Sequence, residues 1–185
     1  MTSTLEIWKD AQPTLSDGVI TIRPWNSSDI EWVYGTCQDE AIQRWTRVPS
    51  PYSRDDAEHF VITHAGNSWD AGVGAHFAVV ASEDEGLVGS VALSDVRTFD
   101  RVSEGGFWTV PESRGQGLTT RALSLLTHWA IETAGFVRLE LNIEVENAAS
   151  RVVGELSGYQ LDGVFQKKIW KHGAHRDVAL YSYVR

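Results

Sequence analysis

The chain has 185 residues, of which 42% are hydrophobic and 22% are charged, and this predicts one globular domain over residues 1–185 with a sizeable core. Its formal net charge of −9 argues against nonspecific binding to nucleic acid, which needs clustered Lys and Arg, and suits a cationic substrate. The single cysteine, Cys37, excludes an internal disulfide and a multi-cysteine zinc site.

Residues 1–17 are expected to form a loosely ordered lead-in without the basic flank and apolar segment of a secretory signal. No later apolar run approaches the roughly 20 residues that span a bilayer. We therefore expect a cytoplasmic protein that does not bind a membrane. The first strand is predicted over residues 18–25, where Pro24 interrupts it.

Two helices are predicted next. The first follows the candidate caps Asn26 and Ser28, and the second begins at Ser53, which stands three residues before Asp56. The proline-broken segment 44–53 between them is expected to be a loop that lines a substrate entrance.

Strands and helices alternate through the rest of the chain. Strands are predicted over 76–81, 87–96, 105–110, 136–145, 163–170 and 178–184, with turns at 82–86 and 171–177. Helices are predicted from Gly117 to Ala134 and from the N-cap Asn147 to the stop at Gly158. This order predicts a mixed α/β domain with helices packed on a central sheet.

The segment VPESRGQGLTT (110–120) connects a predicted strand to a predicted helix. Free N–H groups at the start of a helix favour an anion, Gly115 and Gly117 permit positive φ, and Arg114 can add a charged contact. A P-loop would need a lysine, and a dinucleotide motif would need a third glycine where Thr120 stands. The segment is therefore either a plain turn or an anion site of another kind.

Residues 104–159 resemble the acyl-CoA-binding half of the GCN5-related N-acetyltransferases (GNAT), and within them the RimJ/RimL-type branch. The family's Arg/Gln-x-x-Gly-x-Gly/Ala signature falls on Arg114, Gly117 and Thr119, so a threonine takes the last small position. The branch's N-x-x-S falls on Asn147 and Ser150. Similar ends, RPWNSSDI and HRDVALYSYV, extend the resemblance over about residues 18–184.

The resemblance implies a GNAT-like acyl-CoA N-acyltransferase fold, with a mixed, mostly antiparallel sheet that splays between its fourth and fifth strands and helices on both faces. It also implies acetyl-CoA as the cosubstrate, with a strand bulge near Trp108 and Thr109. The implied cofactor-binding residues are Trp108, Thr109, Val110, Arg114, Gly115, Gln116, Gly117, Leu118, Thr119, Thr120, Asn147 and Ser150. The pyrophosphate would lie on the amides of residues 115–120, and the pantetheine along residues 108–110.

Acyl transfer to an amine requires the amine to lose a proton, which a carboxylate can accept. Glu104, at the entry to the splayed strand, is the first candidate for this base, and Glu140 and Glu144 are rivals. A backbone N–H of Val110 or Thr109, freed by the bulge, could stabilise the oxyanion.

The thiolate of CoA needs a proton donor. Many relatives have a tyrosine seven residues after the motif asparagine, where this chain has Gly154. Ser150 is the remaining hydroxyl, either as this acid or as part of the helix cap, whereas Tyr159 is expected in the core. The six histidines lack metal-ligand spacing, so no metal is expected.

The leading hypothesis is an N-acetyltransferase that moves acetyl from acetyl-CoA to a primary amine, either a protein N-terminus or a small amine such as an antibiotic. A catalytically silent acyl-CoA-binding module is the alternative, suggested by Thr119 and Gly154. A nucleotide-binding role comes third. The protein is expected to be a monomer or a homodimer.

Overall fold

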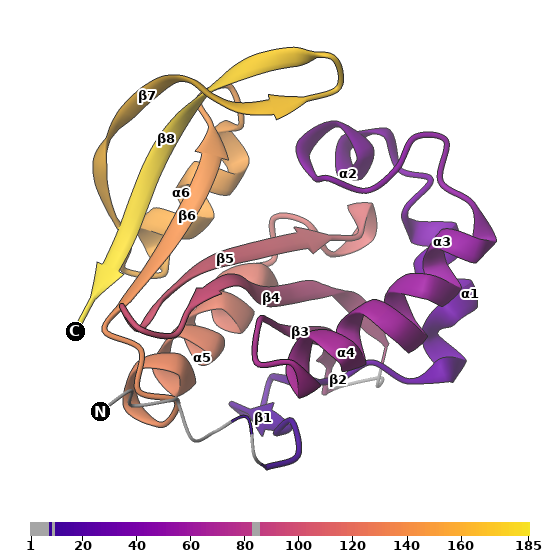
Figure 1. Cartoon of the computed structure of the whole chain (residues 1–185). Coiled ribbons are helices and arrows are strands. Elements are labelled where there is room, and N and C mark those ends of the chain that lie inside the picture. Colours follow the sequence, from indigo (N-terminus) through magenta and orange to yellow (C-terminus); the bar gives the residue numbers. More distant parts are fainter. Residues whose placement is uncertain (1–7, 9, 83–85) are drawn as a thin grey trace.

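The computed structural model describes residues 8, 10–82 and 86–185, and Figure 1 shows their arrangement. The strands are β1 (Leu15–Ser16), β2 (Ile20–Pro24), β3 (Ala75–Ala81), β4 (Leu87–Arg97), β5 (Val102–Thr109), β6 (Arg138–Glu144), β7 (Gln160–Lys171) and β8 (Ala174–Val184). The helical segments are η2 (Ser27–Asp29), α1 (Ile30–Thr36), α2 (Glu40–Trp45), α3 (Arg54–Glu58), η3 (His59–His64), α4 (Ala65–Asp70), η4 (Pro111–Ser113), α5 (Leu118–Glu132) and α6 (Ala148–Leu156). None of the helices within these described ranges is both long and apolar enough to cross a membrane.

All eight strands belong to one sheet in the order β1-β2-β3-β4-β5-β6-β8-β7. Neighbours are antiparallel except for β5 and β6, which pair in parallel from Val102↔Arg138 only as far as Glu104↔Glu140. Beyond that point the two strands diverge, as Figure 1 shows. The predicted mixed sheet, splayed between the fourth and fifth expected strands, is confirmed.

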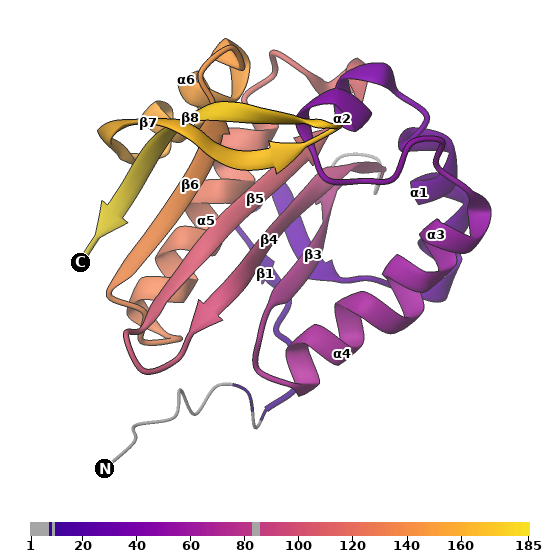
Figure 2. The same ribbon diagram turned by 45° about the horizontal axis from the view of Figure 1, so that its top comes forward.

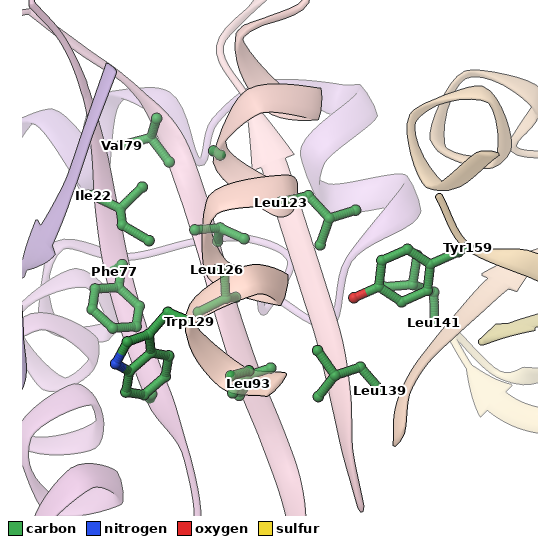
Figure 3. Packing of buried hydrophobic residues seen from close by; sticks show 14 of the residues in the cluster. Ile22, Phe77, Val79, Leu93, Leu123, Leu126, Trp129, Leu139, Leu141 and Tyr159 are labelled. Carbon is green, nitrogen blue, oxygen red and sulfur yellow. The ribbon is translucent and has the colours of Figure 1, made fainter. Parts of the chain in front are cut away.

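Helices cover both faces of the sheet, as predicted. Helix α5 lies across one face, and its apolar stripe, including Leu123, Leu126 and Trp129, packs against Phe77 and Leu93 from the strands (Figure 3). Burying each such side chain stabilises the fold by about 1.5–3 kcal/mol. This core includes buried residues of β2, β3, β4 and β6, so it extends across the place where β5 and β6 diverge.

A second, smaller core lies on the opposite face, beneath α1 and the continuous run of α3, η3 and α4 (Figure 2). Trp25, Val33, Ala57 and Val61 are buried there, and Trp108 of β5 packs against the same cluster. This core therefore anchors the helices that face the open part of β5.

Several predicted boundaries shift. Of the lead-in predicted over 1–17, residues 1–7 and 9 lie outside the described part, and its end forms β1. The loop predicted over 44–53 starts later, because α2 includes Arg44 and Trp45: the side chain of Asp39 caps α2 by accepting a hydrogen bond from Ile42 N at 2.9 Å, and Ile42 is buried. The sequence did not predict this helix, because six residues are too few to show an apolar stripe and no proline marks its start.

The helix predicted from Ser53 has the expected capping box with Asp56, and the helical run continues to Asp70 through the π-helical turn η3. Of the turn predicted at 82–86, residues 83–85 lie outside the described part. The turn predicted at 171–177 is shorter, since β7 and β8 pair as far as Lys171↔Ala174.

The bulge predicted near Trp108 and Thr109 is wrong. Pairing between β4 and β5 is regular from Gly89↔Thr109 to Ser94↔Glu104, and the irregularity lies beyond Ser94. Gly89 permits the close approach, because a Cβ there would lie 2.3 Å from the carbonyl oxygen of Trp108. The gap between β5 and β6 therefore opens by divergence alone.

Candidate functional site

A cavity of about 530 Å³ lies on the α1 to α4 face of the sheet and reaches the gap between β5 and β6. This volume is within the ordinary range for small-molecule sites. Four of the predicted site residues line it: Glu104, Trp108, Asn147 and Ser150. Arg114 and residues 115–120 do not line it, so the predicted residues divide into a cavity group and a helix-entry group.

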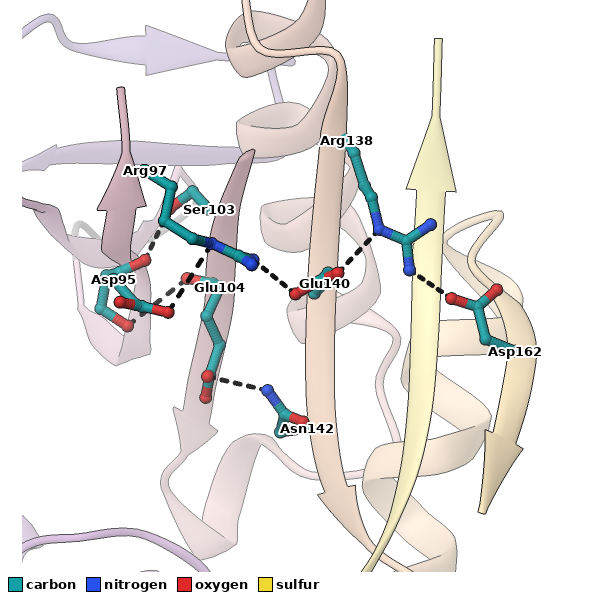
Figure 4. A network of polar contacts seen from close by, with 9 residues as sticks. Asp95, Arg97, Ser103, Glu104, Arg138, Glu140, Asn142 and Asp162 are labelled. Carbon is teal, nitrogen blue, oxygen red and sulfur yellow. Dashed lines mark hydrogen bonds and ion pairs between the residues drawn. The ribbon is translucent and has the colours of Figure 1, made fainter. Parts of the chain in front are cut away.

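Glu104 is the last residue of β5 that pairs with β6, and its side chain lies at the cavity end of the gap. Asn142 of β6 donates a hydrogen bond from its Nδ2 to Oε2 of Glu104 at 2.8 Å, as Figure 4 shows. The Oδ1 of Asn142 is buried, and no donor in the described residues reaches it. The pair thus presents two acceptor oxygens, Glu104 Oε1 and Asn142 Oδ1, to which no described residue donates a hydrogen bond.

The two rival candidates for the base, Glu140 and Glu144, are both paired with cationic side chains. Glu140 accepts from Arg97 at 2.6 Å and from Arg138 at 2.7 Å (Figure 4). Burial acts to raise the pKa of Glu140, but the two guanidinium groups outweigh it and hold the pKa below its ordinary value. A carboxylate with a lowered pKa is a weaker base.

Glu144 forms an ion pair with Lys171, and both side chains are nearly buried. Arg176 adds a second cationic group, with its Nε 3.9 Å from Glu144 Oε2. Within the described residues Glu104 has no cationic partner, so it is the candidate base with a carboxylate free to accept a proton.

The helix-entry group forms a turn of open amides. Gly115 and Gly117 have φ values of +73° and +76°, a region that favours glycine, and Gly117 caps α5 without a side-chain hydrogen bond. No acceptor in the described part of the chain binds the backbone N–H groups of residues 115–120. Six consecutive unpaired amides at the positive end of a 15-residue helix can hold a phosphate.

Arg114 is already engaged at this entry. Its Nε donates to the carbonyl of Thr109 at 3.1 Å, and its guanidinium contacts Asp39 Oδ1 at 2.6 Å. Burial acts to raise the pKa of Asp39, but the hydrogen bond from Arg114 helps to bring the pKa below its ordinary value. Arg114 therefore joins the start of α2 to the end of β5.

The backbone of β5 offers one of the two predicted oxyanion donors. The N–H of Val110 donates to Val88 O at 3.0 Å, so the prediction that it is free is wrong. In an antiparallel pair the amides alternate in direction, and this register turns the N–H of Thr109 away from β4, toward the open side. The Thr109 hydroxyl contacts that of Thr119.

Helix α6 brings Asn147 and Ser150 to the gap. Asn147 caps the helix, with its Oδ1 accepting from the backbone N–H of Ser150 at 3.1 Å. The hydroxyl of Ser150 takes no part in this cap and has no hydrogen bond to any described residue. Gly154 faces β6, where a Cβ would lie 3.1 Å from a methyl of Leu141, so a larger side chain here would press on Leu141.

Cys37 and Tyr159 both lie in the core, and for Tyr159 this was expected. Cys37 is 1% exposed, and burial raises the pKa of its thiol to about 11 despite a hydrogen bond with Tyr52, so it remains a protonated core residue. Tyr159 is also buried in the core, and its hydroxyl is 2.8 Å from that of Thr127. Sequence reasoning missed Asn142 as a site residue, although it stands on the polar side of the predicted strand 136–145.

The sequence model of the acetyltransferase (GNAT) domain family matches residues 20–160. "Putative ribosomal N-acetyltransferase YdaF" of Bacillus subtilis (strain 168) is 29% identical over 102 residues, which are 55% of this chain and 56% of that protein. The chain thus spans about half the length of this curated relative.

Solved structures with the same fold include Mycobacterium smegmatis RimJ in complex with CoA-disulfide, with a TM-score of 0.85 and 19% identity over 94% of this chain and 88% of that one. Another is the ribosomal-protein-S5-alanine acetyltransferase of Vibrio fischeri, with a TM-score of 0.80 and 18% identity over 93% and 96%. At these identities the two likenesses establish the fold.

Proposed function

Because the chain belongs to the acetyltransferase (GNAT) domain family, we propose that it transfers the acetyl group of acetyl-CoA to a primary amine by direct attack. The observation that carries the proposal is Glu104: its carboxylate lies where β5 leaves β6, inside the cavity, with Asn142 as its hydrogen-bond partner and without an ionic partner among the described residues.

The six open amides of residues 115–120 support the expected seat for the pyrophosphate of CoA. Nothing lies within 4 Å of a Cβ position at Gly115 or Gly117, so a ligand can approach the backbone closely. The gap between β5 and β6 then provides room for the pantetheine arm, which would lie along residues 108–110 with the N–H of Thr109 facing it.

In the proposed reaction the amine nitrogen attacks the thioester carbon, the new C–N bond forms, and the C–S bond breaks. Glu104 accepts the proton that the amine loses, directly or through water. The amide of Thr109 stabilises the developing oxyanion. The free hydroxyl of Ser150 passes a proton to the departing thiolate and takes one from water in the same step, and Asn142 holds the Glu104 carboxylate in place.

The acceptor is proposed to be the α-amine of a peptide or a small-molecule amine. The net charge of −9 favours a cationic acceptor by long-range attraction. The ribosomal-protein acetyltransferases among the relatives and structural neighbours support a peptide N-terminus. A monomer or a homodimer can contain this site, since all of the residues invoked belong to one chain.

The test is a thiol-release assay with acetyl-CoA and a panel of amines and N-terminal peptides, run beside a calorimetric titration with CoA. We expect micromolar CoA binding and release of CoA that depends on the acceptor. CoA binding without turnover on any acceptor would instead identify a silent acyl-CoA-binding module. Competition by ATP that displaces CoA would identify a nucleotide site.

A further inference from the structure

The floor of the cavity beside the gap crosses three strands, and its residues on β5 and β4 are small. Gly106 of β5 pairs with Ala92 of β4, and Ala92 pairs with His76 of β3. All three line the cavity. Because neighbouring strands lie about 4.8 Å apart, His76 stands about 10 Å from β5, and only a methyl group and a glycine lie between.

Gly106 leaves this space open, although its backbone conformation does not require a glycine. It has an ordinary negative φ, and a Cβ placed on it would meet nothing within 4 Å. The flanking cavity residues on β4, Ser90 and Ser94, are also small. The small residues therefore leave a recess between the gap and β3, and a group of the ligand can fill it.

Aromatic rings close the far end of the recess. The ring centroids of His64 and His76 are 4.7 Å apart, and Phe60 lies 6.0 Å from His64 and 5.8 Å from His76. The arrangement of His76 edge-on to Phe60 is a favourable one for aromatic pairs. Burial and the neighbouring His64 lower the pKa of His76 to about 4, so the His76 ring is uncharged at neutral pH.

Each of the three acidic groups that line the cavity already has a partner or a place in the proposed reaction. Oδ2 of Asp56 accepts from both the backbone N–H and the hydroxyl of Ser53. Glu144 is paired with Lys171 on the other side of the gap. Glu104 stands at the gap itself, where the proposed reaction uses it.

We propose that this recess, formed by Gly106, Ala92, Phe60, His64 and His76, binds an aromatic ring carried next to the acceptor amine. The substrate class is thus a peptide with an aromatic N-terminal residue or an arylalkylamine. A ring on a one-carbon stem fills the space between the gap and the aromatic wall, whereas the side chain of Ala or Ser leaves it empty. The inference rests on the proposed acetyl transfer and names its acceptor.

The experiment compares kcat/KM for acetylation of peptides that differ only in a first residue of Phe, Tyr, Leu, Lys, Ser or Ala, in the wild type and in Gly106→Val. We expect at least a tenfold preference for Phe and Tyr over Ala in the wild type. The valine side chain fills the recess, so the ratio of Phe to Ala should fall at least tenfold in Gly106→Val. Gly163→Val, a matched change in β7 away from the cavity, should leave the ratio within twofold of the wild type.

A preference for Lys, Ser or Ala, or a Phe-to-Ala ratio unchanged by Gly106→Val, would overturn the aromatic recess and leave acetyl transfer intact. Absence of transfer to every amine would overturn the proposed function. A second measurement separates these failures: titration with N-acetylphenylalanine amide and N-acetylalanine amide, in the presence of CoA, requires no turnover. Tighter binding of the phenylalanine product, lost in Gly106→Val, supports the recess, and equal binding of both products refutes it.

Discussion

His76 should make the stability of the protein fall between pH 6.5 and pH 4. Burial and the neighbouring ring of His64 disfavour the imidazolium, so the pKa of His76 falls from the ordinary 6.5 to about 4. Between these two values the unfolded chain binds a proton at this position and the folded chain does not. Lowering the pH therefore favours the unfolded state, and the effect is complete below about pH 4.

The separation between the two pKa values corresponds to about 3 kcal/mol of folding free energy, of which about 2 kcal/mol is already lost at pH 5. Asp39, Asp56 and Glu140 also have lowered pKa values in the folded protein. They reduce the folding free energy chiefly below pH 5, because such carboxyl groups titrate near pH 4 in the unfolded chain. The difference in unfolding free energy between pH 7.5 and pH 5 therefore reports mainly on the histidines.

The measurement is the free energy of unfolding in urea at pH 7.5 and pH 5 for the wild type, His76→Phe and His128→Phe. His128 lies exposed on α5 and serves as the matched control. We expect the loss between the two pH values to be about 2 kcal/mol smaller in His76→Phe than in the wild type and unchanged in His128→Phe. The same loss in all three proteins would refute a neutral, partly buried His76 at the end of the recess.

Three further outcomes test the reaction site. Arg114→Ala combined with Gly117→Asp should weaken CoA binding at least tenfold in a calorimetric titration, because a carboxylate would occupy the open amides; unchanged affinity would exclude this turn as the pyrophosphate seat. Glu104→Gln should lower turnover mainly below pH 8, where the amine stays protonated without a base, and a uniform loss across a pH profile would point to a structural role. Ser150→Ala should slow turnover while CoA affinity and the unfolding free energy stay near the wild-type values, since the cap uses the backbone N–H of Ser150; a matching loss of stability would contradict a role in proton transfer.

Many of the helices and strands could be predicted from patterns among neighbouring residues. The alternation in residues 136–145, the stripe on α5 and the capping pair Ser53 and Asp56 each act over a few neighbouring residues, so their elements are visible in the sequence. The glycines at 115 and 117 mark the helix entry for the same reason. By contrast, α2 is too short for a stripe, and its start depends on the capping contact of Asp39.

The choice among the candidate carboxylates needed the tertiary structure. Glu104, Glu140 and Glu144 are alike in sequence, and they differ because Arg97, Arg138 and Lys171, from separate strands, neutralise two of them. The same holds for Asn142, whose contact with Glu104 joins residues 38 positions apart.

The sequence by itself determined the order of the main strands and helices, the open turn before α5 and the family resemblance, because each of these depends on residues close together in the chain. The tertiary structure decided that the gap opens without a bulge, that Val110 is not a free donor, and that small residues face an aromatic wall across three strands. Those features depend on strand register and on contacts between distant segments, and neither composition nor periodicity specifies which strands become neighbours.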